Sequence, residues 1–445
     1  MGLTTAACLA DLGHHIIGID SSEERIRTLQ QGKAPFYEEG LDGLVAAGIA
    51  SGRLEFSSSA KETGANSRIA FVCVPTPSLP EGSADLSMVK EVVTDLADVL
   101  SSDAVIVIKS TVPVGTNKLV KEWLDRDDLV IASNPEFLQA GRAVATFQNP
   151  DRIVLGADTE QALDLLSELY DGVDAPIIRT DPQSAELIKY ASNAYLATRL
   201  SFVNTIATLC EQGGGDASTV LAGMGLDHRI GQAFLQPGPG WGGSCFPKDT
   251  RALAAVARDQ NADTTLLDAT LIANEKRFDQ VVSRVSEHFD QDLSRRTIAF
   301  WGLTFKAGTD DLRDSPSLEI AERLIAQGAS VKAYDPMVRD APNKEIFDRL
   351  CKPKFDQGAF YKLEQTLELL PSLDTRTVCR HTLIKHESLG HHEDYARLDN
   401  IADPDFIEAK GYVNVGNSQN NLSIENMPTH QEVMDFSNTL APMVG

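Results

Sequence analysis

The chain has 445 residues, of which 42% are hydrophobic and 23% are charged. This composition is typical of water-soluble globular proteins, and no apolar run approaches the roughly 20 residues that a membrane span needs. With 40 basic and 64 acidic side chains the net charge is −24, which repels nucleic acid and argues against it as a partner. No basic leader precedes the first apolar runs, so we expect a cytoplasmic protein. An anionic ligand would need positive charge concentrated at its site.

The first twenty residues resemble the inside of a nucleotide-binding βαβ unit. Small residues between positions 4 and 10 would let a helix lie close to a sheet, and an apolar run ends at Asp20. Asp20 follows Gly2 by 18 residues, close to the spacing at which a carboxylate binds the ribose hydroxyls of NAD. The strand and further glycines of this fingerprint belong before Gly2, where only Met1 stands. We therefore expect a sequence that begins at an internal methionine or is truncated, and that binds NAD poorly as written.

Residues 2–180 alternate short apolar strands with amphipathic helices, which is typical of a parallel, doubly wound sheet. Ligands bind such sheets at the carboxyl ends of the strands, where this sequence places polar or rigid residues. We expect strands at residues 15–20, 68–74, 104–110, 129–133 and 152–156.

Residues 181–290 are expected to be helical. Asp181 and Pro182 are typical of a helix start, and about thirty residues without a breaker follow, as in a domain spine or a dimer seam. A strand–loop–helix–strand order returns at residues 295–336, and the remainder predicts few elements. Histidines near 381–392 indicate a solvated loop more than a metal site.

One glycine-rich segment, GPGWGGSCFPKD, presents a single thiol, Cys245, with Asp249 four residues later. Glycines let the backbone approach a ligand closely, and a nucleophilic cysteine needs nearby cations to favour the thiolate. Lys189 and Lys248 are candidates for that charge. The six cysteines contain no CxxC pair, so we expect no metal site and no disulfide framework.

Seven further motifs occur in order with this segment: GLTTAACLADLGH, KSTVPVGT, NPEFL, NPDRIVLG, ELIKYASNAYLA, GLDHRIGQAFL and FKAGTDDLRDSP. Together they resemble the UDP-glucose/GDP-mannose dehydrogenase family over about residues 2–340. The resemblance implies two Rossmann-like domains joined by a central long-helix domain. The expected divisions are an NAD-binding domain at 1–180, a helical dimerisation domain at 181–290 and a UDP-sugar-binding domain at 291–445.

The resemblance also implies an NAD-dependent, two-step oxidation of a sugar alcohol to a carboxylate. Cys245 would hold the aldehyde as a thiohemiacetal and then as a thioester, which water hydrolyses. Lys189 and Asn193 would stabilise the oxyanion, and Asp249, Glu136 and Thr111 would order the water. The implied NAD contacts are Gly2, Asp20, Arg25, Thr76, Thr111 and Arg313.

The implied UDP-sugar contacts fall in four segments, with Arg229 supplied by a neighbouring subunit of a homodimer or larger homo-oligomer. They are Glu136, Phe137, Leu138, Gln139, Ala140, Lys189, Asn193, Arg229, Phe234, Gln236, Gly238, Trp241, Gly242, Phe305 and Lys306. Most motifs favour UDP-glucose, giving UDP-glucuronate. FKAGTDDLRDSP is also close to GDP-mannose enzymes, so GDP-mannose and other UDP-hexoses stay open as substrates.

Two further departures from the family pattern leave another class of function open. Ala140 stands where the family usually has an acid, and the last hundred residues lack the family's late nucleotide-binding motifs, although 411–417 offers one strand. An inactive, truncated homologue that only binds a nucleotide sugar is therefore the alternative to an enzyme.

Overall fold

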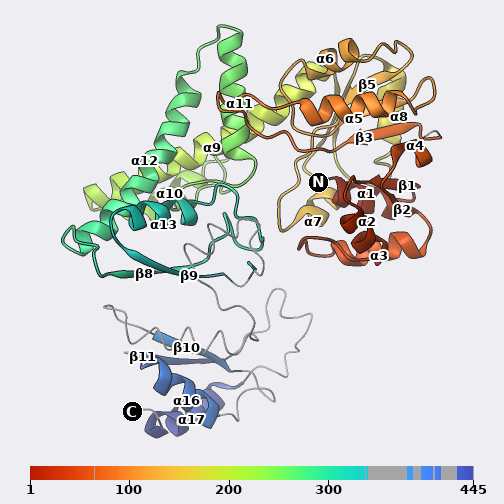
Figure 1. Cartoon of the computed structure of the whole chain (residues 1–445). Coiled ribbons are helices and arrows are strands. Elements are labelled where there is room, and N and C mark those ends of the chain that lie inside the picture. The colour runs from red at the N-terminus through yellow and green to blue at the C-terminus, as the bar shows by residue number, and fades with distance from the viewer. Residues whose placement is uncertain are drawn as a thin grey trace. The chain divides into compact units, whose positions relative to one another are not determined.

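A computed structural model describes residues 1–64, 66–335, 337–338, 378–383, 392–403, 406–411 and 428–443. The chain divides into two compact units, Met1–Lys352 and Pro353–Gly445, which are described separately below (Figure 1). Among the described helices, none is long and apolar enough to cross a membrane.

The first unit begins with a small βα layer. Strand β1 (Ile16–Ile19) pairs in parallel with β2 (Leu54–Ser57), and helix α1 (Gly2–Asp11) packs against both. Each of these strands has one hydrogen-bonded neighbour among the described residues. The small residues predicted to let α1 approach the sheet are buried except Ala6, which is half-buried, and Ala7 is fully covered.

A second, five-stranded sheet has the order β3-β4-β5-β6-β7. All its neighbours are parallel except β5 and β6, which run antiparallel. The expected parallel sheet is therefore confirmed except at β6, which runs antiparallel to β5 because the chain turns back after β5 through a short helix. Its strands are β3 (Ile69–Val72), β4 (Val105–Ile108), β5 (Val130–Ser133), β6 (Ile153–Ala157) and β7 (Ile177–Thr180).

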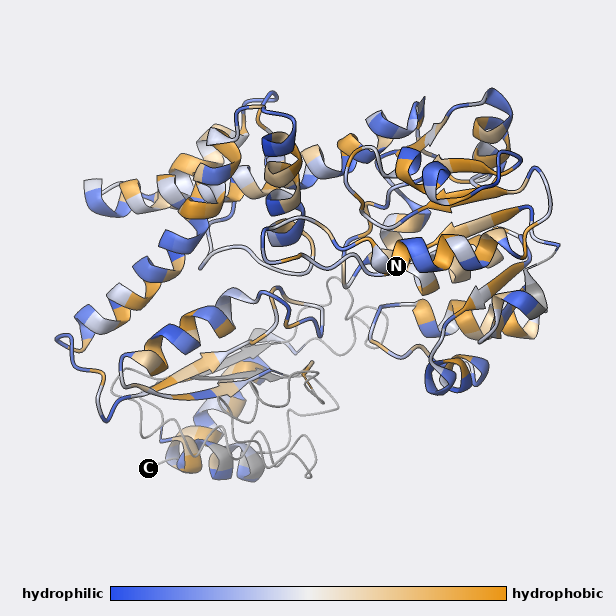
Figure 2. Ribbon diagram, turned by 45° about the horizontal axis from the view of Figure 1, so that its top comes forward, coloured by the Kyte–Doolittle hydropathy of each residue, from blue (hydrophilic) through white to orange (hydrophobic). Residues whose placement is uncertain are grey.

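Alternation along β4 shows that both faces of this sheet are covered. Val105 and Val107 join one apolar cluster with α1 and α8, whereas Ile106 and Ile108 join another with α5 and α6. Figure 2 shows these strands in orange between helices that are orange on one side and blue on the other. The helices of this region are α2 (Glu23–Gln30), α3 (Leu41–Ala50), α4 (Ala60–Thr63), α5 (Ser87–Ala97), α6 (Thr116–Trp123), α7 (Ala143–Gln148) and α8 (Glu160–Glu168).

The predicted long helix is α9 (Pro182–Gly213), and it starts where the sequence indicates. The Asp181 side chain accepts a hydrogen bond from the Ser184 amide at 2.8 Å, and Pro182 occupies the first turn. Three further helices pack around α9: α10 (Ala217–Gly225), α11 (Phe246–Asp259) and α12 (Thr265–His288).

The unit ends with a second βαβ element, as expected. Strands β8 (Thr297–Trp301) and β9 (Ser330–Tyr334) are parallel, and α13 (Pro316–Ala326) connects them. Asp335 follows β9, and its carboxylate accepts the backbone N–H of Leu303 at 2.7 Å. This fixes the loop after β8.

The second unit has its own small core. Strands β10 (Val378–Leu383) and β11 (Phe406–Gly411) are parallel, with α16 (His392–Ala402), α17 (His430–Leu440) and a 3-10 turn (Ala441–Met443). Phe436 and Leu440 of α17 pack on Ala396 of α16. The strand expected at 411–417 begins earlier than predicted, and its residues beyond 411 lie outside the described part of the chain. The domain expected over 291–445 spans the division after Lys352 and stays a prediction.

Candidate active site

The thiol of Cys245 lies immediately before α11, at the end of the glycine-rich loop. Its Sγ is 3.6 Å from the Ser244 Oγ, and the residue is half-buried. Its carbonyl oxygen accepts the Asp249 amide N–H at 2.8 Å, so the first turn of α11 places Asp249 on the same side of the helix.

Asp249 is fully buried and has two polar partners. The Asn193 Nδ2 donates to one carboxylate oxygen at 2.6 Å, and the Lys248 Nζ donates to the other at 2.5 Å. Lys248, one of the two candidate cations for the thiol, is therefore paired with Asp249.

Lys189 lies one turn before Asn193 on α9 and is also buried. Its Nζ is 3.5 Å from Glu136 Oε1 and 5.2 Å from the centre of the Phe137 ring. The second Glu136 oxygen accepts the Leu138 amide at 2.6 Å. The long helix thus carries a lysine and an amide, each beside a buried carboxylate.

Burial raises the pKa of the Cys245 thiol above its ordinary value of 9.0. Lys189 acts in the opposite direction, and Asp249 and Glu136 add to the rise. All three groups are close enough to influence the sulfur. Lys189 thus favours the thiolate as expected, but burial and the two carboxylates outweigh it, so the pKa of Cys245 is raised.

Thr76 and Thr111 follow β3 and β4 and are joined by a hydrogen bond. The Thr76 Oγ1 donates to the Thr111 carbonyl at 2.7 Å, and both residues are buried. This places two predicted NAD contacts together at the carboxyl edge of the sheet.

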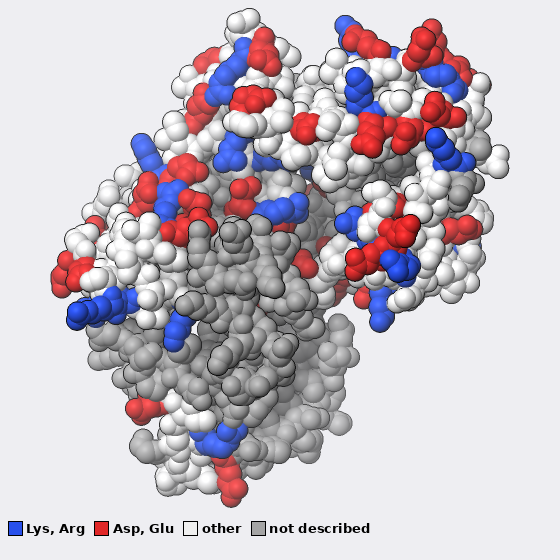
Figure 3. All heavy atoms as spheres, viewed as in Figure 1, with Lys and Arg blue, Asp and Glu red and all other residues white. Residues whose placement is uncertain are grey.

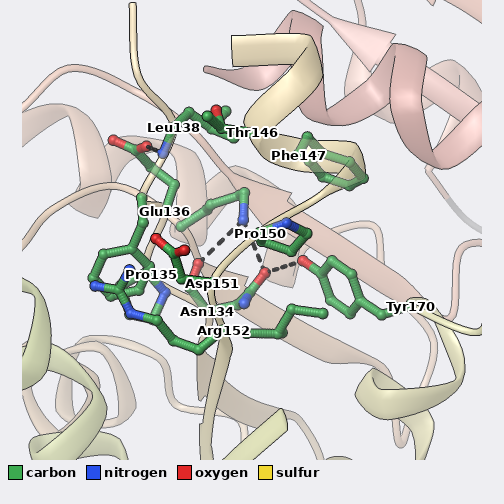
Figure 4. A pocket seen from close by; sticks show the side chains of 13 residues that line it. Asn134, Pro135, Glu136, Leu138, Thr146, Phe147, Pro150, Asp151, Arg152 and Tyr170 are labelled. Atoms are coloured by element: carbon green, nitrogen blue, oxygen red, sulfur yellow. Dashed lines mark hydrogen bonds between the residues drawn. The ribbon is translucent and has the colours of Figure 1, made fainter. Parts of the chain in front are cut away.

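A buried polar network lies behind the segment that carries Glu136 (Figure 4). The Asn134 Oδ1 accepts Lys109 Nζ at 2.9 Å and the Tyr170 hydroxyl at 2.5 Å, while its Nδ2 donates to the Val154 carbonyl at 2.9 Å. Lys109, Asn134 and Tyr170 border a cavity of about 50 Å³. One amide therefore ties together strands β4, β5 and β6 just before Glu136.

The predicted substrate contacts that follow Glu136 are contacted by residues that do not belong to that network. The Arg152 guanidinium lies 3.6 Å from the centre of the Phe137 ring, and the Gln139 amide donates to Thr146 Oγ1 at 3.2 Å. Ala140 is half-buried and its side chain offers no polar group.

In the βα layer of β1, β2 and α1, the positions of Asp20 and Gly2 suit binding of the NAD ribose. Asp20 follows β1, and its carboxylate accepts the Ser22 amide at 2.9 Å and Arg25 Nη1 at 2.7 Å. Gly2 begins α1 so close to the end of β3 that a Cβ there would lie 3.1 Å from the Cys73 Cβ. An acid at a strand end beside a helix N-terminus suits a ribose next to a pyrophosphate.

Arg313 lies elsewhere, beside the glycine-rich loop. Its carbonyl accepts the Gly243 amide at 3.1 Å, and its guanidinium pairs with Asp311 at 2.7 Å. Within the described residues it makes no hydrogen bond to Gly2, Asp20 or Thr76.

Two other predicted contacts, Phe305 and Lys306, also border this loop. A Cβ at Gly243 would lie 2.7 Å from the Phe305 ring, and a Cβ at Gly242 would overlap the Asp314 carbonyl oxygen. The Lys306 Nζ is 5.7 Å from the centre of the Phe305 ring, and burial lowers its pKa. Glycines 242 and 243 are therefore required where the loop meets the segment after β8.

Arg229 makes no hydrogen bond to the other predicted site residues within the described part of the chain. Its side chain is 79% exposed and its hydrogen bonds go to Asp227, at 2.6 Å for the shortest. Gln236 is exposed, and Phe234, at 40% exposure, has its ring 6.4 Å from that of Phe246. Gly238 and Trp241 lie in the loop itself.

Sequence reasoning missed the side chains that hold these loops. Glu38 accepts the amides of Gly141 at 3.0 Å and Ala143 at 2.7 Å. Four others bind the glycine-rich loop: Ser201, Asn204, Asn274 and Arg277. The sequence indicates these four residues only as polar side chains on the inward face of a helix.

On the face shown in Figure 3, acidic and basic side chains are interspersed over the described surface. Of the two positive charges near the thiol, Lys189 is buried and Lys306 is exposed. This meets the requirement that an anionic ligand find local positive charge on an acidic protein.

Comparison with known proteins agrees with this geometry. Family models for the NAD-binding, central and UDP-binding domains of UDP-glucose/GDP-mannose dehydrogenases match residues 1–174, 183–276 and 299–378. A UDP-glucose 6-dehydrogenase of Rhizobium meliloti is 42% identical over 346 residues, covering 76% of this chain and 79% of that protein. The chain belongs to the UDP-glucose/GDP-mannose dehydrogenase family. It is an NAD-dependent oxidoreductase with the α/β fold predicted.

Two other relatives extend the likeness of this dehydrogenase to archaea. A UDP-glucose 6-dehydrogenase of Haloferax volcanii is 40% identical and covers 76% of this chain and 81% of its own. A solved UDP-glucose dehydrogenase from Pyrobaculum islandicum is 35% identical, with a TM-score of 0.76 over 82% of this chain and 85% of that one.

The end of this dehydrogenase chain matches a different family. Residues 401–445 fit a model described as wyosine base formation. This match falls within the second compact unit, Pro353–Gly445.

Proposed function

We propose that the protein oxidises C6 of UDP-glucose twice, giving UDP-glucuronate, with Cys245 as the covalent nucleophile. The observation that carries this is the convergence of a thiol, the Lys189–Glu136 pair and the Asn193–Asp249 pair in one buried cluster. The UDP-glucose 6-dehydrogenases among its relatives support the choice of sugar.

NAD, when bound, accepts one hydride in each of the two oxidations. Asp20 would hold its ribose, and Thr76 and Thr111 would line the sheet edge beside it. Asp20 also favours NAD over NADP, because a 2′-phosphate would meet a carboxylate.

In the first oxidation, C6 loses a hydride and its hydroxyl loses a proton, leaving an aldehyde. Lys189 and Asn193 stabilise negative charge on that oxygen, and Lys189 carries the proton away from it. The buried position of both groups strengthens these interactions, because water does not screen them.

The Cys245 sulfur then adds to the aldehyde carbon while the thiol proton passes to the carbonyl oxygen. The resulting thiohemiacetal retains one C–H, whose hydride is lost in the second oxidation as its hydroxyl loses a proton. Water adds to the thioester carbon and the C–S bond breaks, giving a carboxylate and regenerating the thiol. Asp249, Glu136 and Thr111 order this water.

We propose that two chains form a dimer along α9. Tyr195, Phe202 and Leu209 are 63%, 52% and 57% exposed and recur every seven residues, which places them on one face of the helix. The exposed Arg229 would then reach the partner's substrate. The cytoplasm stays the proposed compartment, where NAD and nucleotide sugars are metabolised, and the divisions at residues 180 and 290 stay proposed domain boundaries.

A second function is proposed for the C-terminal unit alone. The core of Ala396, Phe436 and Leu440 and the wyosine base formation match over residues 401–445 support a separate module there, whereas residues 353–378 of the same unit match the UDP-binding model. Phe436→Asp in the full chain should unfold this unit, detected as new proteolytic cleavage beyond residue 352, and leave the rate of NADH formation unchanged. An equal loss of NADH formation would show that the unit belongs to the dehydrogenase.

The assay for the main proposal is NADH formation from limiting UDP-glucose. Two NADH per sugar, with UDP-glucuronate as product, support it. If GDP-mannose or another UDP-hexose is oxidised and UDP-glucose is not, that sugar nucleotide is the substrate. No NADH with any sugar nucleotide would leave the inactive binding homologue as the function.

A further inference from the structure

We infer that Asn274 and Arg277, one turn apart on α12, are positioning residues that fix the Cys245 thiol opposite the long helix. The inference rests on the proposed covalent role of Cys245. Neither residue touches the thiol itself, and both act through the loop of residues 237–244.

The loop of residues 237–244 forms no helix or strand, and Asn274 supplies hydrogen bonds to its backbone. Its Oδ1 accepts the Trp241 amide N–H and its Nδ2 donates to the Trp241 carbonyl, both at 2.9 Å. The residue is 6% exposed, so water does not compete for these bonds. One side-chain amide thereby satisfies both backbone groups of the residue four positions before Cys245.

Arg277 holds the loop at a second point. Its Nε donates to the Gly238 carbonyl at 2.8 Å, and its Nη1 donates to Thr208 Oγ1 at 3.2 Å and Gln280 Oε1 at 3.3 Å. The residue is 8% exposed and has no carboxylate partner within the described part of the chain. A buried guanidinium directed at a carbonyl gives a strong, charge-assisted bond.

Helix α9 binds the same loop from its other side. Asn204 Oδ1 accepts the Gly238 amide and Ser201 Oγ accepts the Trp241 indole N–H, each at 2.8 Å. Ser201 also donates to the Thr270 carbonyl of α12 at 3.2 Å. Since Lys189 and Asn193 belong to α9, one frame of two helices sets the position of the thiol relative to the amine and the amide.

The loop lies flat against α12. At Gly240, where φ is +135°, a Cβ would overlap the Phe278 ring. No side chain separates the loop backbone from the helix there, so loss of the Asn274 bonds moves the backbone directly. A displaced thiol captures the aldehyde less often, and the aldehyde escapes after one oxidation.

Asn274→Asp in the full chain tests this, because it keeps the shape, replaces the donor to the Trp241 carbonyl by an oxygen and adds a negative charge. Asn274→Ala removes both bonds, and Ser201→Ala is a milder change to the same loop should Asn274 variants fail to fold. Asn261→Asp is the matched control, since Asn261 is exposed between α11 and α12. Circular dichroism melting checks that each variant folds.

Two measurements separate a positioning role from a general loss of stability. With limiting UDP-glucose, Asn274→Asp should give fewer than two NADH per sugar, with the aldehyde trapped by hydroxylamine and the KM for NAD unchanged. The rate at which iodoacetamide alkylates Cys245, measured by peptide mass spectrometry, should differ about tenfold or more between Asn274→Asp and the unaltered chain. The control should match the unaltered chain in both.

A folded Asn274→Asp or Ser201→Ala chain with two NADH per sugar and an unchanged alkylation rate would overturn the inference. The alkylation arm needs no turnover, so it decides the positioning role even if UDP-glucose is not oxidised. In that case the absence of NADH from the unaltered chain would count against the proposed function alone.

Discussion

The Asn193 amide nitrogen lies 2.6 Å from a carboxylate oxygen of Asp249, although 56 residues separate them in the chain. The contact joins the middle of α9 to the first turn of α11, where the thiol begins the helix. It makes the oxyanion stabiliser and the water-ordering acid of the proposed mechanism one hydrogen-bonded unit.

Removal of the thiol should stop turnover. Cys245→Ser retains the size and polarity of the side chain but cannot form a thioester, so kcat for NADH formation from UDP-glucose should fall by at least about 10³-fold. Cys210→Ser, at the far end of α9, is the control and should keep full activity. A Cys245→Ser chain that retained activity would exclude the covalent route.

Hydrolysis of the thioester should depend on Asp249. Asp249→Asn keeps the shape and loses the charge that pairs with Lys248. We expect rapid formation of NADH in the first turnover and then a slow steady state, with an acylated Cys245 peptide detected by mass spectrometry. Steady-state loss without acylation would place Asp249 in an earlier step.

The pH dependence of thiol alkylation follows from the raised pKa of Cys245. Burial favours the neutral thiol, so the reactive thiolate should form half-maximally above pH 9.0, the ordinary value for cysteine. Lys189 lowers this pKa, and Lys189→Met should therefore move the profile to still higher pH. Peptide-resolved iodoacetamide rates between pH 7 and 11 measure both, and a profile centred below pH 9.0 would contradict the environment described.

Two buried tyrosines should respond oppositely to the same substitution. Tyr190 is fully buried and its hydroxyl has no hydrogen-bond partner in the described part of the structure, so Tyr190→Phe should leave stability unchanged or raise it by about 1 kcal/mol. Tyr170→Phe removes the bond to Asn134 and should lower the free energy of unfolding by about 1–2 kcal/mol. Urea unfolding measures each, and the reverse order would contradict the network in Figure 4.

Glu186 should be important for the attachment of α9 to the NAD-binding region. It is buried and accepts the Gly115 amide at 2.6 Å and the Asn117 amide at 2.9 Å, at the start of α6. Glu186→Ala leaves these donors unsatisfied and should cost about 3 kcal/mol in the free energy of unfolding. Glu186→Gln keeps one acceptor and should cost less, and equal losses would show that the charge alone matters.

The exposed stripe on α9 should control the oligomeric state. Phe202→Glu places a charge at the centre of Tyr195, Phe202 and Leu209 and should convert a dimer to a monomer, as measured by analytical ultracentrifugation. Leu266→Glu, on an exposed position of α12, is the control. A monomeric unaltered chain would remove both the dimer and the proposed role of Arg229.

Although β2 and β7 were missed, strands β1, β3, β4, β5 and β6, the start of α9 and the family were predictable from the sequence itself. These depend on residues near one another in the chain: apolar periodicity, Asp181 followed by Pro182, and contiguous motifs such as GGSCFPKD. The same local patterns named the thiol and its expected partners.

Only the tertiary structure decided how those residues meet. The raised pKa of Cys245, the pairing of Lys248 with Asp249, the antiparallel β6 and the bonds from Asn274 to Trp241 all depend on segments remote in sequence. Burial and hydrogen bonding are set by packing between such segments. The sequence of one protein does not show which groups, distant along the chain, lie together in a site. The separate core of the C-terminal unit likewise became visible only in three dimensions.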